Sequence, residues 1–195
     1  MICRTSTWTV EKANSAGLVG NLMAESGVMS DRIEGSRPQS PMTARDFSGR
    51  SRTFTPEEVR DRNFKAKQGP KLPGIGLAQW TTKSRRDGLF NHTYQGKQLG
   101  TAILSNLDAQ VDYLVTELKG SYSSINDSLL ADGTANDASD NVVYGFEVPG
   151  AILANKKKLP RSDPRVQAVF AQRRANAGEV LKIYNAAQAA ANKTN

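Results

Sequence analysis

The chain has 195 residues, a formal net charge of +7, one cysteine and one histidine. This length is enough for one domain with a substantial core. Cys3 and His92 are the only residues of their kinds, which excludes an internal disulfide and a cysteine-based or histidine-rich metal centre. The single histidine also disfavours a Ser-His catalytic triad. We therefore expect neither a metal nor another cofactor.

The positive charge predicts attraction to polyanions such as nucleic acid, anionic lipid or the acidic groups of a cell wall. The Lys and Arg residues are spread along the chain, without the interleaved aromatic residues of single-stranded nucleic-acid binders. No specific nucleic-acid partner is therefore expected, and each basic cluster is most simply a solvated face. The sequence also has no apolar run long enough to span a bilayer and no signal-peptide core near its start.

Residues 1–12 are polar and are predicted to form a short lead-in. An apolar helix follows, beginning at Thr9 or Ala13 and ending at Ser26. Apolar residues recur at helical spacing on one face of this segment.

Three glycines and one acid distinguish this helix. Gly17 and Gly20 lower its stability, which suggests that another element packs close to its backbone. Gly27 is expected to end it as a C-cap. Glu25 then lies in the last turn, at the edge of the apolar face and at the negative end of the helix dipole. Both features favour a protonated carboxyl, the state that a general acid needs, although a solvated glutamate is the simpler interpretation of Glu25 taken alone.

Residues 28–54 are rich in Ser, Arg, Gly and Pro and lack periodicity, which predicts a long ordered loop with at most a small β-turn region. The sequence TPEE at 55–58 is typical of a helix start, with a threonine cap, proline at the first position and glutamate at the third. This helix is expected to end before Gly69 and Pro70.

A second motif, GIGLAQWT, occupies residues 74–81. Its glycines permit unusual backbone conformations or close approach to a ligand. Gln79 supplies hydrogen-bond donors and an acceptor, and Trp80 supplies a flat apolar face with one N–H. This combination suits a sugar, although the motif taken alone could also be an ordinary loop with a core tryptophan.

Hydrophobic spacing predicts further helices over residues 84–92, 106–118, 121–131 and 134–146. In the first of these, Leu89 and Phe90 are expected to point inward. The 106–118 segment has the clearest core-facing stripe, formed by Leu107, Val111, Leu114, Val115 and Leu118.

The region from Pro149 to Pro160 is predicted to be a loop holding three consecutive lysines. The last helix is expected to begin after Asp163 and to run to about Ala190. Strand signals are nearly absent, so the predicted fold is all-α, or mainly α with a small β element, in a single domain. That domain is expected to cover residues 13–190, between the lead-in and a tail at 191–195.

The blocks GLVGNLMAESG and GIGLAQWTTKSRRDGL together resemble the phage tail lysozyme family. They are similar to the Glu-Ser and Gly-Leu-x-Gln motifs of goose-type lysozymes and soluble lytic transglycosylases. The resemblance continues through LDAQVDYLVTEL, NVVYGFEVPGAI and RRANAGEVLKIY, and so covers about residues 13–185.

The resemblance implies an α-helical lysozyme-like fold and cleavage of the β-1,4 bond between N-acetylmuramic acid and N-acetylglucosamine. Glu25 matches the catalytic acid of the family. The expected substrate-binding residues are Ser26, Gly76, Leu77, Gln79, Trp80 and Tyr144. For Tyr144 the match is to the groove-facing tyrosine of the transglycosylases, from whose Ala-Tyr-Asn signature the sequence VVYGFE departs.

A hydrolase needs a second group to activate water, and the nearby candidates are Asp31, Glu34 and Asp46. Asp31 and Glu34 are close enough in sequence to fold back over the groove. In a lytic transglycosylase the muramyl 6-hydroxyl attacks the sugar carbon in place of water. A single catalytic glutamate, here Glu25, can then suffice. The sequence leaves both mechanisms open.

Three polar residues have expected roles that are not catalytic. Ser26 is predicted to orient Glu25 or the nearby backbone, because no base is placed to activate it as a nucleophile. Asn21 could orient the carboxylate or simply pack. Glu147 is expected to form a structural ion pair with Arg173 or Arg174.

The resemblance also implies peptidoglycan strands and other phage tail or virion proteins as partners. The expected location is the virion, with action in the host cell wall or periplasm. Two other functions are considered: a wall-docking virion component that no longer cleaves and, ranked third, a nucleic-acid-binding protein. The intact Glu25 motif argues against loss of activity.

Overall fold

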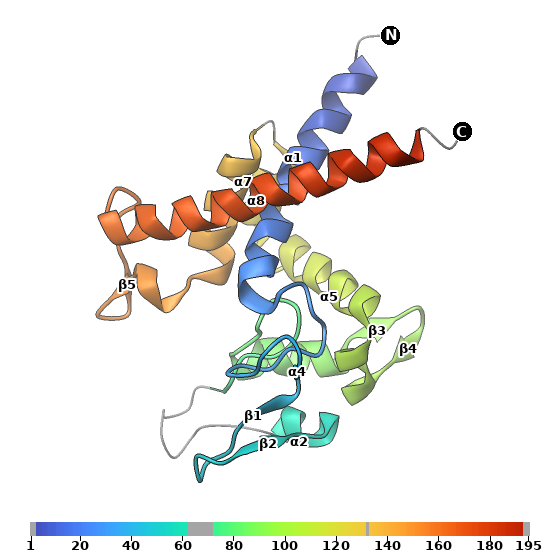
Figure 1. Ribbon diagram of the computed structural model, residues 1–195, viewed down its shortest axis with the longest axis vertical. Coiled ribbons are helices and arrows are strands. Elements are labelled where there is room, and N and C mark those ends of the chain that lie inside the picture. The colour runs from blue at the N-terminus through green and yellow to red at the C-terminus, as the bar shows by residue number, and fades with distance from the viewer. Residues whose placement is uncertain (1–2, 62–71, 132, 193–195) are drawn as a thin grey trace. The chain divides into compact units, whose positions relative to one another are not determined.

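The computed structural model describes residues 3–61, 72–131 and 133–192, and the side chains of its first helix from Lys12 onward. It is mainly helical, with three two-stranded antiparallel ladders, which confirms the predicted fold class (Figure 1). The chain divides into two compact units, one formed by Met1–Ala24 with Leu118–Asn195 and the other by Glu25–Glu117. None of the described helices is both long and apolar enough to cross a membrane.

The first unit contains most of α1 and the C-terminal helices. Its elements are α1 (Cys3–Ser26), α6 (Ser123–Leu130), α7 (Ala135–Val142), η2 (Val143–Glu147), η3 (Gly150–Ile152), β5 (Leu153–Ala154), β6 (Lys157–Lys158) and α8 (Pro164–Ala191). The predicted start of the first helix at Thr9 or Ala13 is wrong, because α1 already begins at Cys3, within the segment predicted as a lead-in. The segment from Cys3 to Lys12 contains neither Pro nor Gly, so nothing in it stops the helix from extending toward the N-terminus.

The two glycines of α1 allow close helix packing, as their positions predicted. A Cβ atom on Gly17 would lie 2.6 Å from the Cβ of Ala138 in α7. A Cβ atom on Gly20 would lie 2.5 Å from the backbone N of Ala177 in α8. Both distances are shorter than real Cβ contacts allow, so glycine is required where α1 crosses α7 and α8.

Caps define the ends of the other helices in this unit. Thr134 and Asp137 form a reciprocal capping box at the start of α7. The Asp163 side chain accepts a hydrogen bond from the Arg165 N–H at the start of α8, which confirms the predicted helix start. A π-helical turn, η2, follows α7 and places Val143 in a small core cluster with Ile152, Val166 and Phe170.

The predicted loop between Pro149 and Pro160 is instead a β-hairpin. Leu153 pairs with Lys158 and Ala154 with Lys157. The two residues between these strands, Asn155 and Lys156, both adopt left-handed backbone with φ of 49° and 62°. Such a two-residue turn matches the natural twist of a hairpin, and asparagine tolerates this conformation well.

The second unit contains the remaining hairpins and the central helices. Its elements are β1 (Thr43–Arg45), β2 (Ser51–Thr53), α2 (Pro56–Asp61), α4 (Lys83–Asn91), β3 (Thr93–Tyr94), β4 (Lys97–Gln98), η1 (Gly100–Ser105) and most of α5 (Leu107–Lys119). The predicted helix at 84–92 is confirmed, with Leu89 and Phe90 buried.

The predicted helix start at 55–58 is also confirmed. The Glu58 carboxylate accepts the Thr55 N–H at 2.8 Å, and the Thr55 hydroxyl accepts the Glu58 N–H at 3.2 Å. The predicted end of this helix before Gly69 lies outside the described residues. In the segment predicted as an irregular loop, the β1–β2 hairpin supplies the small β region that was expected.

The predicted core stripe of α5 is partly wrong. Leu107, Val111 and Val115 are 36–43% exposed, whereas Leu114 and Leu118 are buried as expected. Two polar side chains of α5, Gln110 and Glu117, are buried in addition. Hydrogen bonds to these two residues rotate the buried face of the helix away from the stripe that hydrophobicity alone predicts.

Candidate active site

Glu25, the expected catalytic acid, lies in the last turn of α1 and is half-buried. The predicted C-cap at Gly27 is confirmed, because Gly27 and the following Val28 adopt left-handed backbone with φ of 69° and 61°. The buried Ser26 hydroxyl accepts a hydrogen bond from the Met29 N–H at 3.3 Å. Ser26 therefore fixes the turn that directly follows Glu25.

Backbone pairing joins the second motif to the segment that follows Glu25. The carbonyl oxygen of Arg32 accepts hydrogen bonds from the Gly76 N–H at 2.7 Å and from Gln79 Nε2 at 3.1 Å. Ile33 and Ile75 form an antiparallel bridge beside these bonds, and both are fully buried. The structure thus brings the 74–80 motif against residues 30–34, within ten positions of Glu25.

Gln110 ties both segments to α5. Its side chain is fully buried, and its Oε1 accepts the Leu77 N–H at 2.8 Å. Its Nε2 donates to the carbonyl oxygens of Ser30 at 2.8 Å and Ile103 at 2.9 Å. One amide therefore satisfies three backbone groups from three segments. Sequence analysis missed Gln110, and the only available signal was a polar residue within the apolar repeat of residues 106–118.

The turn at 76–79 depends on two left-handed residues, Gly76 at φ 69° and Gln79 at φ 46°. A Cβ atom on Gly76 would lie 2.6 Å from Gln110 Oε1, so space as well as conformation requires glycine there. The half-buried Gln79 side chain donates through Nε2 to Gly76 and Arg32. Its Oε1 accepts no hydrogen bond from the described residues and can accept one from a ligand.

Trp80 supports this turn from within the core. Its indole is fully buried and donates to Glu117 Oε2 at 2.6 Å. Glu117 also pairs with Arg85, at 2.8 Å to Nε and 2.9 Å to Nη2. The Tyr113 ring lies 5.3 Å from the Trp80 ring. Because the indole has no exposed surface, it does not offer the sugar-binding face that its residue type suggested; Leu77 is likewise fully buried.

Two of the three carboxylates considered as a catalytic base, Glu34 and Asp31, differ in their surroundings. Glu34 is held against the second motif, because its Oε2 accepts the Gly74 N–H at 2.7 Å. Asp31 is half-buried, and its carboxylate makes no hydrogen bond or ion pair with any described residue. Asp31 is therefore the carboxylate of this segment that is left to contact water or substrate.

Asp46 has a structural role in the turn between β1 and β2. Its Oδ1 accepts the Ser48 hydroxyl at 2.6 Å and the N–H groups of Ser48 and Arg50 at 2.8 and 3.0 Å. These hydrogen bonds, that of the Ser48 hydroxyl foremost, hold the pKa of Asp46 below its ordinary value. An ionised carboxylate that is already used in this way suits a turn better than a water-activating base.

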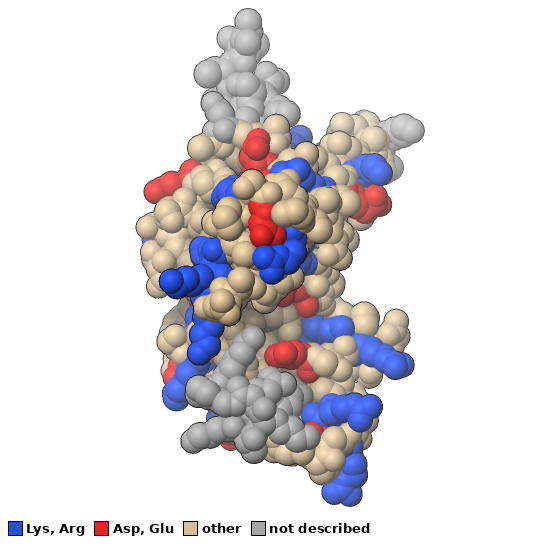
Figure 2. Space-filling model, turned by 90° about the vertical axis from the view of Figure 1, so that its left-hand side faces the viewer, with Lys and Arg blue, Asp and Glu red and all other residues tan. Residues whose placement is uncertain are grey.

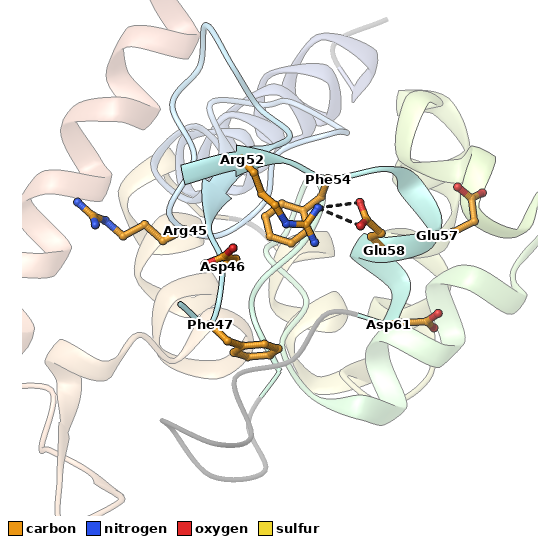
Figure 3. Close-up of a pocket in the computed structure, with 8 residues that line it drawn as sticks. All are labelled: Arg45, Asp46, Phe47, Arg52, Phe54, Glu57, Glu58 and Asp61. Carbon is orange, nitrogen blue, oxygen red and sulfur yellow. Dashed lines mark hydrogen bonds and ion pairs between the residues drawn. The ribbon is translucent and has the colours of Figure 1, made fainter. Parts of the chain in front are cut away.

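Asp46 also borders a cavity of about 320 Å³ in the second unit (Figure 3). The lining residues are Arg45, Asp46, Phe47, Arg52, Phe54, Glu57, Glu58 and Asp61. The Arg52 guanidinium lies 3.9 Å above the Phe54 ring and binds both oxygens of Glu58 at 2.9 and 3.0 Å. These contacts join β2 to α2 along one wall of the cavity, and neither the Glu25 block nor the 74–81 motif contributes to it.

Tyr144, the remaining predicted substrate-binding residue, belongs to the first unit. Its hydroxyl donates to the Leu159 carbonyl oxygen at 2.7 Å. Its ring is contacted by Lys158 Nζ at 5.0 Å and by the Arg161 guanidinium at 4.8 Å. These bonds anchor Tyr144 to the β5–β6 hairpin, and its contact with a substrate stays a prediction.

Two further polar predictions concern the first unit. Asn21 is fully buried and donates to the carbonyl oxygens of Gly17 at 2.9 Å and Ser139 at 3.1 Å, which favours packing over orientation of Glu25. Arg174 pairs with Asp140 at 2.5 Å, so it is not the partner that was expected for Glu147. The alternative pairing, of Glu147 with Arg173, stays a prediction.

Basic and acidic side chains share the face of the molecule that Figure 2 shows. Figure 2 shows Lys and Arg side chains in several separate groups on one face, with Asp and Glu side chains among them. Within the described part of the chain, no three His, Cys, Asp or Glu side chains are grouped so that they could hold a metal ion.

Comparison with known proteins identifies the chain's family. The family model described as phage tail lysozyme matches residues 4–184, which is nearly the whole chain. No curated protein and no solved structure gives a significant match. The matched range contains both motifs, including Glu25 in the last turn of α1 and the turn at 76–79. The chain therefore belongs to the phage tail lysozyme family.

Proposed function

We propose that this protein is a peptidoglycan-cleaving lysozyme that hydrolyses the β-1,4 bond between N-acetylmuramic acid and N-acetylglucosamine. The family supports a lysozyme-like action on peptidoglycan. The main structural support is the pairing of residues 30–34, which follow Glu25 after a short turn, with the 74–80 motif. This pairing joins the segment that follows the helix bearing Glu25 to the predicted sugar-binding turn by hydrogen bonds.

In the proposed reaction Glu25 donates its proton to the glycosidic oxygen as the C–O bond breaks. Asp31 then accepts a proton from the water that adds to the sugar carbon, which completes hydrolysis. Asp31 is preferred over Glu34 and Asp46 because those two carboxylates already accept backbone N–H groups. Gln79 Oε1 is the group that we expect to accept a hydrogen bond from the substrate.

The acid assignment is tested by measuring reducing ends released from purified peptidoglycan. Removing a general acid typically costs about 10²–10⁴-fold in rate, and we expect a loss of that size for Glu25→Gln. Asp87→Asn is the matched control, because Asp87 is an exposed carboxylate on α4 that pairs with Lys83. A Glu25→Gln variant that is folded and as active as the control would contradict the assignment.

The base assignment is tested by two variants from the same segment. We expect Asp31→Asn to lose about 10²-fold or more in rate. Glu34→Gln should lose much less, because a glutamine oxygen can still accept the Gly74 N–H. Equal losses of cleavage rate in the two variants would contradict the assignment of Asp31, rather than Glu34, as the base. Full activity of Asp31→Asn, with products lighter by one water, would instead identify a lytic transglycosylase.

We further propose that the enzyme is carried in the virion, with other tail proteins as partners, and acts on the host wall during entry. The family supports a virion-associated protein that acts on the cell wall. Activity of intact particles on host walls, lost when this chain carries Glu25→Gln, is the expected result. Particles that bind walls equally well with either chain but never cleave them would favour the wall-docking alternative.

A further inference from the structure

The β5–β6 hairpin of the first unit and the segment that follows it are rich in positive charge. Between Lys156 and Arg165 the chain has five cationic residues and one acidic residue. The cationic residues are Lys156, Lys157, Lys158, Arg161 and Arg165. The single acid, Asp163, is already used, because it caps α8 and pairs with Arg165 at 3.1 Å.

The hairpin holds its lysines in fixed positions. Its turn consists of two left-handed residues, and its strands pair in register on both sides of that turn. Lys158 is fixed further, because its Nζ donates to the Tyr144 carbonyl oxygen at 2.8 Å. Arg161 donates to Asn141 at 2.9 Å and lies over the Tyr144 ring. These contacts hold the base of the hairpin in place, and its tip projects from that base.

The side chains of the two lysines nearest the tip do not contribute to the hydrogen bonds and ion pairs of the described residues. Lys156 and Lys157 are exposed, and neither side chain makes a hydrogen bond or ion pair with any described residue. Adjacent like charges repel one another and so do not stabilise the hairpin by themselves. An external polyanion would remove this repulsion.

We propose that the β5–β6 hairpin, through Lys156 and Lys157 supported by Lys158, is a docking surface for a phosphodiester polymer of the bacterial cell wall. Lysines act as point charges toward phosphate and need no fixed geometry. On a strand, adjacent side chains point to opposite faces, so Lys157 and Lys158 project in different directions. Such an arrangement suits a flexible chain with repeated anionic groups rather than one small anion.

Two other polyanions fit the hairpin less well. Binding of single-stranded nucleic acid uses exposed aromatic rings for base stacking, but the nearby Tyr144 ring is already contacted by two cations. Attachment to an anionic lipid surface is favoured by exposed apolar side chains. The hairpin tip, Asn155 to Lys157, has none. The proposal goes beyond the proposed function and depends on it only for the location of the polymer in the wall.

The test measures binding of the full chain to purified poly(glycerol phosphate) and to isolated walls, in a Glu25→Gln background so that the walls stay intact. At about 50 mM salt we expect Lys156→Gln with Lys157→Gln to weaken binding about tenfold. The control variant, Lys97→Gln with Lys119→Gln, removes the same charge from two exposed sites. Lys97 lies in the β3–β4 hairpin, and Lys119 lies at the end of α5. This control should lose about twofold at most.

Binding should fall to the level of the hairpin variant when phosphodiester polymer is stripped from the walls by acid. Three results would overturn the proposal: an equal loss in the control, lysine-dependent binding that persists on stripped walls, or tighter lysine-dependent binding to duplex DNA at equal phosphate concentration. Circular dichroism checks that each variant is folded. Because the assay needs no cleavage, an inactive wild type that still binds the polymer would refute the proposed function and support the docking surface.

Discussion

Single polar side chains link segments of this chain that lie far apart in the sequence. Gln110 is the clearest example, because one buried amide satisfies backbone groups at Ser30, Leu77 and Ile103. It connects the turn after Glu25 with the second motif, so the geometry of the candidate site depends on a residue that contacts no substrate in our proposal.

Replacement of Gln110 by alanine should therefore lower both stability and activity. Each buried group left without a partner costs about 1–3 kcal/mol, so we expect Gln110→Ala to reduce the free energy of unfolding by about 3 kcal/mol or more. Urea unfolding measures this change. Gln98→Ala is the control, because the exposed Gln98 side chain bonds to Asn91 alone among the described residues, and the change in stability should be less than about 0.5 kcal/mol. Similar changes in the free energy of unfolding for the two variants would show that the hydrogen bonds of Gln110 do not hold the candidate site together.

Among the helices and strands, the features predicted correctly from the sequence are those that a few neighbouring residues determine. The Thr55–Glu58 capping box, the C-cap at Gly27 and the start of α8 after Asp163 were each predictable, because a few adjacent residues decide them. The buried face of α5 was not, because the partners of Gln110 and Glu117 lie elsewhere in the chain. The hairpin at 153–158 was missed because its strands are only two residues long and give no period-2 pattern.

The same limit applies to the candidate site. Glu25 and the 74–81 motif could be found from their residue types and from the family resemblance. Sequence could not show that Trp80 is buried against Glu117 and Tyr113. An indole suits a core and a sugar platform equally well, and only its neighbours decide between them.

Close packing of α1 leads to a prediction about two glycines. Gly20→Ala should destabilise the protein by about 1–3 kcal/mol, because the new methyl group would meet the Ala177 backbone. Gly178→Ala should instead stabilise it by up to about 1 kcal/mol, because Gly178 is helical and a Cβ there meets open space. Thermal unfolding of both variants measures the contrast, and a stabilised Gly20→Ala would refute the close crossing of α1 and α8.

At the scale of the whole molecule, ionised carboxylates should make stability depend on acidity. The Thr134 hydroxyl holds the pKa of Asp137 below its ordinary value of 3.8, and Arg52 similarly lowers the pKa of Glu58 from 4.5. A lowered pKa in the folded state stabilises the protein above the unfolded pKa, and this stability is lost as pH falls through the folded pKa.

We therefore expect the urea midpoint to change little between about pH 7 and 5 and to fall below about pH 4.5, toward and through the lowered pKa values. The net charge of +7 increases as carboxylates are protonated, which adds repulsion in the same range. Asp137→Asn together with Glu58→Gln should reduce the fall. A midpoint at pH 3 equal to that at pH 7 would mean that these hydrogen bonds and ion pairs contribute nothing to stability.

Mass spectrometry of the muropeptides released from purified peptidoglycan identifies both the bond that is cleaved and the dependence of cleavage on Glu25. We expect the wild type to release fragments that end in reducing N-acetylmuramic acid, and the Glu25→Gln variant to release almost none. Fragments that end in reducing N-acetylglucosamine, or the absence of any release by the wild type, would contradict the proposal that Glu25 protonates the bond after N-acetylmuramic acid.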